Sequence, residues 1–219
     1  MSAPVRVKSP PFGTNTWLVP GEGGGCLVVD PGLDGAAVLD ALAAARLRPA
    51  AVICTHGHFD HVGSAAMLQA RFGVAVHLHR ADARTLRSAN FLMMAFRLEE
   101  RIALPEPSWL EDGAVVQAAG LTARFEHAPG HTPGSCLVRV GDALFTGDTL
   151  YADGVGLVSL PGEDAGQLRA TLRRLLDAPP AGQHVHPGHG GDAPLARIRE
   201  ENAALQAFLA ADAGAEGAA

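Results

Sequence analysis

The stretch His56-Gly57-His58-Phe59-Asp60-His61 follows Thr55 and the apolar run of residues 51–54. It brings three imidazoles and one carboxylate together at the end of a predicted buried strand. An extended chain points residues i and i+2 to the same side, so His56 and His58 can bind one ion, while Asp60 and His61, beyond the turn, can reach another. The stretch therefore predicts a site for two metal ions.

Three later loops also carry a ligand-type side chain beside an apolar segment. They are Pro129-Gly130-His131-Thr132-Pro133-Gly134-Ser135, Phe145-Thr146-Gly147-Asp148-Thr149-Leu150 and His186-Pro187-Gly188-His189-Gly190. Four ligand-bearing loops in one chain argue against a chance His-rich turn. We therefore assign the ligands to two ions: His56, His58 and His131 to one, Asp60, His61 and His189 to the other, and Asp148 to a bridging position.

The predicted ligands offer nitrogen and oxygen atoms and no thiolate. This donor set suits divalent zinc, iron or manganese, of which we expect two zinc ions, with iron and manganese as alternatives. Each ion lowers the pKa of a bound water molecule and can polarise a carbonyl or phosphoryl oxygen. Hydrolysis is the reaction that such a pair of ions suits best.

Composition restricts the partners of the chain. Its 219 residues carry a formal net charge of -6, and Lys8 is the sole lysine. Nucleic acid and anionic membranes require concentrated positive charge, so neither is expected, and a small-molecule acyl substrate is the predicted partner. Residues 1–11 lack the apolar core of a signal peptide and no segment is long enough to span a membrane, which predicts a cytoplasmic location. Dimer formation stays open.

Strands and helices alternate along the chain in a layered α/β pattern without an interior linker. Residues 1–211 are therefore predicted to form one domain, and residues 212–219, rich in Ala and Gly, a disordered tail. We expect strands at residues 15–19, 26–29, 51–55, 74–78, 114–116, 121–126, 136–140, 143–146 and 184–186. We expect helices at residues 62–72, 81–87 and 164–176, one capped by Asp34 and one from Pro194.

Three cysteines, Cys26, Cys54 and Cys136, lie within or at the ends of apolar runs. An odd number of cysteines without a secretion signal does not fit a disulfide framework, so we expect reduced core residues. Cys54 lies close enough to His56 for a ligand role to remain an alternative.

These motifs resemble the metallo-β-lactamase superfamily over nearly the whole chain. The sequence around His131 and Asp148 is similar to that of the glyoxalase II-like branch of that superfamily. The resemblance implies a four-layer αββα sandwich with the metals at one edge and the ligand roles given above. It also implies that Asp30, in Val29-Asp30-Pro31-Gly32, orients a ligand through hydrogen bonds.

Two departures from the glyoxalase II pattern concern the substrate. Glyoxalase II proper has a C-terminal helical domain with basic contacts to glutathione, which we do not expect here because the chain stops soon after the predicted Pro194 helix. Many relatives continue from the bridging aspartate to a Gly-Arg-x-Asp segment, whereas Leu157 and Ser159 stand at the corresponding places here. The lost arginine predicts a different, less polar substrate or interface.

Tyr151, three residues after Asp148, is with Asp60 a candidate catalytic residue. Superfamily members that open acyl-homoserine lactones resemble this chain in placing a tyrosine there, where its hydroxyl binds the substrate carbonyl. The alternative is a core aromatic whose hydroxyl has a partner. Residues 90–98, rich in Phe and Met, either form a lid or pocket wall within residues 88–110 or belong to the core or to a dimer contact.

The remaining histidines carry weaker signals. His77 and His79 share one face of a strand and are expected at the surface. His127, His184 and His186 lie near ligand loops, where each either supports a ligand or is a satisfied, partly buried imidazole.

The leading functional hypothesis is a binuclear metal-dependent hydrolase that cleaves a small acyl substrate. A thioester of the hydroxyacyl type is favoured, because a thiolate leaves without a separate proton donor. A lactone or ester hydrolase that uses Tyr151 is one alternative. Another, of a different class, is a mononuclear iron oxygenase similar to persulfide dioxygenases, with His56, His131 and Asp148 as its ligands. A non-catalytic binding protein is disfavoured by the complete ligand set.

Overall fold

The computed structural model describes residues 2–177 and 180–211, so the predicted tail of residues 212–219 lies outside the described part of the chain. Two six-stranded sheets dominate it, in the orders β1-β2-β3-β4-β5-β6 and β12-β11-β10-β9-β8-β7. The first sheet comprises β1 (Val5–Ser9), β2 (Thr14–Pro20), β3 (Gly25–Val29), β4 (Arg48–Ile53), β5 (Val76–His79) and β6 (Pro107–Leu110). The second comprises β7 (Val115–Ala118), β8 (Leu121–His127), β9 (Cys136–Val140), β10 (Ala143–Gly147), β11 (His184–Pro187) and β12 (Ala193–Pro194).

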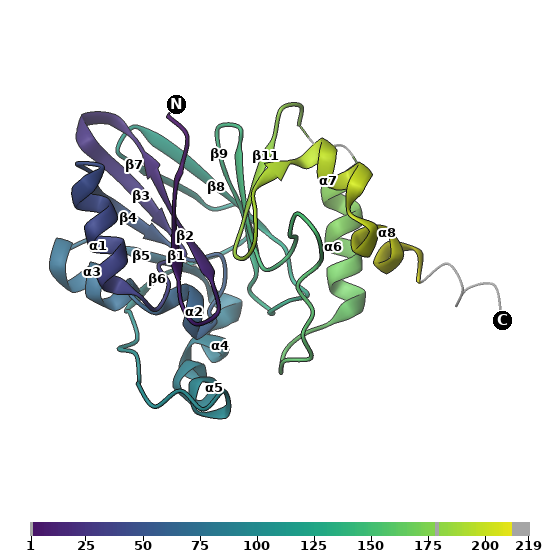
Figure 1. The fold of residues 1–219 in the computed structure, drawn as a ribbon, viewed down its shortest axis with the longest axis horizontal. Coiled ribbons are helices and arrows are strands. Elements are labelled where there is room, and N and C mark those ends of the chain that lie inside the picture. Colours follow the sequence, from purple (N-terminus) through teal and green to yellow (C-terminus); the bar gives the residue numbers. More distant parts are fainter. Residues whose placement is uncertain (1, 178–179, 212–219) are drawn as a thin grey trace.

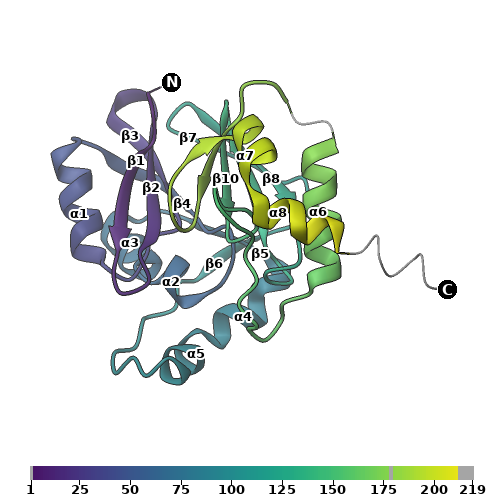
Figure 2. The same cartoon turned by 45° about the vertical axis from the view of Figure 1, so that its right-hand side comes forward.

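Helices cover the outer face of each sheet, as Figures 1 and 2 show. The helices are α1 (Gly35–Ala44), α2 (Phe59–Val62), α3 (Ala65–Phe72), α4 (Ala83–Arg87), α5 (Ala89–Ala95), α6 (Ala165–Asp177), α7 (Leu195–Glu201) and α8 (Ala203–Ala210). Helices α1 and α3 pack on the first sheet, and α6, α7 and α8 pack on the second. The predicted four-layer αββα sandwich is therefore confirmed.

The period of two along each strand explains these layers. In β3, Leu27 and Val29 belong to the core between the two sheets, whereas Cys26 and Val28 belong to the core beneath α1 and α3. Alternate residues of a strand point to opposite faces, so a strand that is apolar throughout can be buried on both sides. The inner strands thus lack the polar alternation of a sheet with one face in water.

Parallel pairing directs several loops to one edge of the sandwich. β3, β4 and β5 run parallel in the first sheet, and β10 and β11 run parallel in the second. The loops that follow their carboxyl ends meet at the edge where α2 begins, and loops at such strand ends form ligand sites in many open sheets. The short helices α4 and α5 extend from the same edge (Figure 1).

Several elements differ from the sequence prediction, including the unpredicted two-residue strand β12 and the helix predicted from Pro194, which is divided at Asn202 into α7 and α8. The edge strands β1 and β6 were not predicted, because β1 is largely exposed and β6 begins at Pro107 in a proline-rich segment. Proline is compatible with the first residue of an edge strand, where its missing N–H costs no ladder bond. The helix predicted over residues 62–72 is divided at Gly63 and Ser64 into α2 and α3, and α2 takes in Asp60 and His61.

Burial confirms the predicted roles of the cysteines and corrects one histidine. Cys26, Cys54 and Cys136 are buried and unpaired, and Cys54 packs in the core between the first sheet and its helices. His79 is buried rather than at the surface, because its ring stacks on His127 with centroids 4.3 Å apart. Among the described residues, no helix has the length and apolar character needed to cross a membrane.

Candidate metal centre

The structure brings the seven predicted ligands together at one edge of the sandwich. Strand β4 ends at Ile53, so His56 and His58 lie in the loop before α2 and not on an extended strand as predicted. Their side chains converge because of the turn of this loop. The alternation of side chains along a strand, which the prediction relied on, is not the cause. The other ligands lie in α2 and in the loops after β8, β10 and β11, namely Asp60, His61, His131, Asp148 and His189.

The potential ligand atoms form groups that match the predicted division between two ions. His56, His58 and His131 form one group, Asp60, His61 and His189 form another, and His56, His61 and Asp148 form a third that joins the two, with the ligand atoms in each group within 4.8 Å of one another. His131 Nε2 and His58 Nδ1 are only 3.0 Å apart. Each group thus offers three nitrogen or oxygen atoms at a spacing that one divalent ion could share.

Asp148 lies between the two groups. Its Oδ2 is 3.6 Å from His131 Nε2 of the first group and 3.4 Å from His189 Nε2 of the second. Its Oδ1 is 3.3 Å from His61 Nε2. A carboxylate in this position can contact an ion on either side, so the geometry fits the bridging role predicted from the sequence.

Hydrogen bonds outside the cluster fix the ring orientation of three histidines. The Nδ1 atom of His131 lies 2.8 Å from the carbonyl of Gly156, and that of His189 lies 3.2 Å from the carbonyl of Phe12. The Nδ1 atom of His61 lies 3.1 Å from the carboxylate of Asp30. A ring that donates Nδ1–H to an oxygen presents Nε2 as a lone-pair donor, which is the usual arrangement of a metal-binding histidine. All three Nε2 atoms point into the cluster.

Unpartnered polar atoms provide a direct test of whether cations fit here. The buried His56 Nε2 has no hydrogen-bond partner, and the buried His61 Nε2 and Asp148 Oδ1 have none but each other, 3.3 Å apart. A buried polar atom without a partner carries a desolvation cost that proteins seldom tolerate. Bound cations would satisfy all three atoms at once, so the residues present fit a pair of metal ions.

Burial keeps the first group ready to bind a cation. Burial and the neighbouring imidazoles of His61, His58 and His131 hold the pKa of His56 well below its ordinary value. Burial and His131 lower the pKa of His58 to about 3. Both rings are therefore neutral at physiological pH, and a neutral imidazole is the form that coordinates metals.

The second group is rich in negative charge. Burial opposes ionisation there, but His61 and His189 hold the pKa values of Asp60 and Asp148 below the ordinary range. Burial also opposes protonation of His189 and His61. Hydrogen bonds to Asp148 and Asp60 nevertheless raise the pKa of His189 to about 9, and the carboxylates also raise the pKa of His61. The positive charge of the protonated imidazoles thus neutralises the carboxylates. Bound divalent cations can supply that positive charge instead.

Asp30 makes the supporting contact that the sequence resemblance implied. Besides holding His61, its carboxylate accepts hydrogen bonds from the backbone N–H and the hydroxyl of Thr55, each 2.7 Å long. It thereby connects α2 with the loop that carries His56. Contacts of this kind orient metal ligands and raise their affinity.

Asp82 is a supporting residue that the sequence did not reveal. It is fully buried and accepts hydrogen bonds from the backbone of Gly57 and Gly134 and from the hydroxyls of Thr132 and Thr85. It lies 25 residues from Gly57 and 50 from Thr132 along the chain, so no local motif connects it with the loops that it joins.

A cavity of about 370 Å³ opens onto the metal centre. Five of the seven predicted ligands line it, and Tyr151 lies beside them with its ring centroid 6.0 Å from that of His189. Burial, together with the charge and a hydrogen bond of Asp148, raises the pKa of Tyr151 well above its usual range, so its hydroxyl stays protonated. Leu92 and Phe96, from the segment predicted as a lid or pocket wall, also line the cavity.

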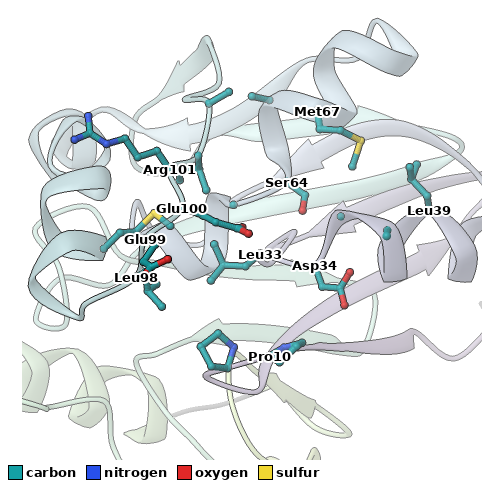
Figure 3. A pocket seen from close by; sticks show the side chains of 18 residues that line it. Pro10, Leu33, Asp34, Leu39, Ser64, Met67, Leu98, Glu99, Glu100 and Arg101 are labelled. Atoms are coloured by element: carbon teal, nitrogen blue, oxygen red, sulfur yellow. The ribbon is translucent and has the colours of Figure 1, made fainter.

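A second cavity, of about 710 Å³, lies between α1, α3 and the segment after α5 (Figure 3). Pro10, Leu33, Asp34 and Met67 are among its lining residues, and none of the predicted ligands reaches it. A small core built around Phe59, Ala89 and Met93 lies between the two cavities. The larger cavity therefore has no part in the metal site.

Comparisons with known proteins agree with this geometry. The Metallo-beta-lactamase superfamily matches residues 9–189. An uncharacterized protein of Mycobacterium tuberculosis is 33% identical over 198 residues, which cover 82% of this chain and 87% of the relative. A hydroxyacylglutathione hydrolase of Anaeromyxobacter dehalogenans is 35% identical over 195 residues, which cover 86% of this chain and 68% of the relative.

Two solved structures share the fold over almost their whole length. The crystal structure of BLEG-1 B3 metallo-beta-lactamase superposes with a TM-score of 0.84 at 27% identity and covers 93% of this chain and 99% of its own. The structure of TTHA1623 in a di-iron-bound form has a TM-score of 0.80 at 34% identity and covers 91% of this chain and 98% of its own. The chain belongs to the metallo-beta-lactamase superfamily.

Proposed function

We propose that this protein is a metal-dependent hydrolase that cleaves a thioester and belongs to the glyoxalase II-like branch of its superfamily. The observation that carries the proposal is the pair of ligand groups on either side of Asp148, which open into a cavity large enough for a small acyl group. The hydroxyacylglutathione hydrolase relative, at 35% identity, supports both the branch and the reaction class.

The predicted ligands would hold two divalent ions, with zinc as the first expectation. Such ions, when bound, supply an ionised water molecule at neutral pH and polarise the carbonyl oxygen of the substrate. The TTHA1623 structure is described as di-iron-bound, which supports two ions in this fold and keeps iron as an alternative.

The protein's own side chains position the substrate and move protons. Asp60 lines the cavity in its ionised form and is fixed by a 2.9 Å hydrogen bond from the hydroxyl of Thr14, so it can accept a proton from an attacking water molecule. The hydroxyl of Tyr151 can donate a hydrogen bond to the carbonyl oxygen, where negative charge develops during attack.

The choice of leaving group follows from the proton donors of the cavity. Beyond the predicted ligands, Tyr151 is the sole residue among the described cavity lining whose side chain bears an ionisable proton. Its raised pKa suits hydrogen-bond donation and makes it a poor acid. A thiolate departs without protonation, whereas an amine does not, so the site favours a thioester over an amide.

Tyr151 also supports a lactone or ester substrate as the second candidate. Its place in the cavity beside His189 is the one that the lactonase interpretation requires, while the hydrogen bond of its hydroxyl with Asp148 also suits an aromatic side chain with a partner. Replacing Tyr151→Phe separates the two candidates. Lactone turnover that is unchanged in the variant would remove the argument for a lactonase.

The oxygenase alternative requires a single iron held by His56, His131 and Asp148. The missing Gly-Arg-x-Asp segment, in whose place residues 156–159 read Gly-Leu-Val-Ser, counts against it. Iron content of one ion per chain together with oxygen consumption on a persulfide would establish the alternative instead.

The test of the proposal is turnover by the metal-loaded protein. The protein is purified without chelator, its metal content is measured, and it is assayed with acyl thioesters of N-acetylcysteamine, with lactones and with a persulfide. We expect thioester hydrolysis that stops on chelation and returns with added zinc or iron. No metal-dependent hydrolysis of any thioester would contradict the proposal.

A further inference from the structure

We propose that the acyl group of the substrate is an uncharged, apolar chain. This inference rests on the proposed function, because it names the acyl half of the thioester. It is drawn from the apolar residues that line the 370 Å³ cavity beside the metal centre.

Half of the residues that line the cavity are polar and half are apolar. Five of its lining residues are predicted ligands, the sixth is Tyr151, and the other six are apolar: Phe12, Phe59, Leu92, Phe96, Val158 and Leu160. The carbonyl must lie beside the predicted ligands for reaction, so a group attached to it can lie against the apolar residues, and we assign that place to the acyl chain.

Three phenylalanines from distant parts of the chain form one cluster in the apolar part of the lining. The ring centroids of Phe12 and Phe59 are 5.3 Å apart, those of Phe12 and Phe96 are 5.6 Å apart, and those of Phe59 and Phe96 are 5.8 Å apart. Edge-to-face packing at these distances is favourable and holds the rings in place. Because Phe59 stands between the predicted ligands His58 and Asp60, this wall is built onto the metal centre itself.

Two further apolar lining residues come from the segment that replaces the Gly-Arg-x-Asp pattern of many relatives. The carboxylate of Glu163 accepts hydrogen bonds from the backbone N–H groups of Val158 and Ser159, at 2.9 and 2.7 Å. These bonds hold the loop so that Val158 and Leu160 line the cavity. Val158 and Leu160 thus add an apolar surface to the cavity.

Exposed apolar side chains gather at the mouth of the cavity. Phe12, Phe96 and Val158 are 36%, 43% and 65% exposed, although large apolar side chains are usually buried. A rim of this kind marks a surface that becomes covered when a ligand binds. An apolar acyl chain would cover these side chains.

The cavity lining carries no positive charge of its own beyond the metal centre. Within the described part of the chain, no lysine or arginine is among its lining residues. A carboxylate at the far end of the acyl group would lose its hydration against phenylalanine and leucine side chains without gaining an ion pair. The cavity therefore disfavours dicarboxylic acyl groups as well as very short ones.

The test uses four N-acetylcysteamine thioesters that differ only in the acyl group, with the metal-loaded protein. Burial of each additional methylene favours binding about fourfold, so we expect kcat/KM for the hexanoyl thioester to exceed that for the acetyl thioester at least tenfold. Succinyl is butanoyl with a carboxylate in place of its terminal methyl group. We expect the butanoyl thioester to be preferred over the succinyl thioester at least tenfold.

Two alanine variants test whether the phenylalanine wall causes the preference for the hexanoyl over the acetyl thioester. Phe96→Ala should lower kcat/KM for the hexanoyl thioester about tenfold and leave the acetyl thioester nearly unchanged. Phe91→Ala is the matched control, because Phe91 lies on α5, which ends just before Phe96, is 67% exposed and does not line the cavity. Its hexanoyl preference should equal that of the wild type.

Equal rates for acetyl and hexanoyl, or a preference for succinyl over butanoyl, would overturn the inference while the thioesterase proposal stood. If no thioester is cleaved, the proposed function fails, and the inference is decided by calorimetry. The probes are then the corresponding uncleavable amides, in which nitrogen replaces the thioester sulfur. Tighter binding of the hexanoyl than of the acetyl and succinyl amides would support the apolar site, and equal or reversed affinities would contradict it.

Discussion

The carboxylate of Asp82 accepts a 2.7 Å hydrogen bond from the backbone N–H of Gly57, in the loop that carries His56 and His58. The same carboxylate accepts a 2.7 Å bond from the N–H of Gly134, in the loop that carries His131. One buried side chain thus fixes the relative position of both loops that supply the first ligand group.

Replacing Asp82→Asn is expected to weaken the metal site and the fold together. The amide group of Asn presents N–H donors to partners that are themselves donors, so at least one buried donor loses its acceptor. Such a loss costs about 2–3 kcal/mol of unfolding free energy. Displacement of supporting residues lowers metal affinity about 10- to 100-fold.

Urea unfolding of the metal-free protein measures the first effect of Asp82→Asn, and competition with a chelator for zinc measures the second. Asp40→Asn, on the exposed face of α1, is the matched control and should change neither quantity. An Asp82→Asn protein with wild-type zinc affinity would show that this carboxylate does not position the loops.

Gly188 is expected to be required for the bridging position of Asp148. A Cβ atom at this glycine would collide with Asp148 Oδ1 and with the ring of His61. Gly188→Ala should therefore lower metal content below two ions per chain while the chain still folds. Gly191→Ala provides the control, since a Cβ there meets nothing within 4 Å. Elemental analysis of both variants checks the prediction, which fails if both retain the wild-type metal content.

His186 is expected to make stability fall in mild acid. Burial and the nearby His184 lower its pKa from 6.5 to about 4, so between these values the unfolded chain binds a proton that the folded chain does not. Stability then decreases as pH falls through that window, by roughly 1–2 kcal/mol between pH 7 and pH 5. His186→Gln removes this titration. Chelator-treated wild type and variant are compared by urea unfolding at both pH values, and parallel losses would refute the assignment.

The three thiols are expected to be inert in the folded protein. Burial raises the pKa of Cys26 to about 12 and raises those of Cys54 and Cys136 as well. Thiolates are the reactive form, and these residues also lie in packed cores. Iodoacetamide at pH 8 should modify none of them natively and all three in guanidinium chloride, as counted by mass spectrometry. Rapid native labelling of Cys54 would revive its role near the metal centre.

The sequence predicted the layers of the fold well because apolar periodicity determines them. The strands ending near Val29 and Thr146 and the helix capped by Asp34 occur as expected, and Asp34 accepts the backbone N–H of Ala37. The edge strands β1 and β6 were not predicted, because an exposed strand has a weak apolar pattern and a proline-flanked strand resembles a loop.

The ligand cluster was also predictable, whereas its supporting contacts were only partly so. The histidines stand in motifs that are recognisable locally, and Asp30 follows a strand in a recognisable motif. Asp82 has no such motif, because its partners come from loops that only the folded chain brings together. The apolar wall was predicted in part from the phenylalanines and methionines of residues 90–98, but Phe12 joins it from the N-terminal hairpin.

The central claim is that this chain binds two cations at the edge of its sandwich. Elemental analysis combined with anomalous diffraction from crystals of the metal-loaded protein tests it most directly. We predict two ions per chain, one held by His56, His58 and His131, the other by Asp60, His61 and His189, with Asp148 contacting both. One ion per chain, or none after incubation with excess zinc, iron or manganese, would contradict the claim.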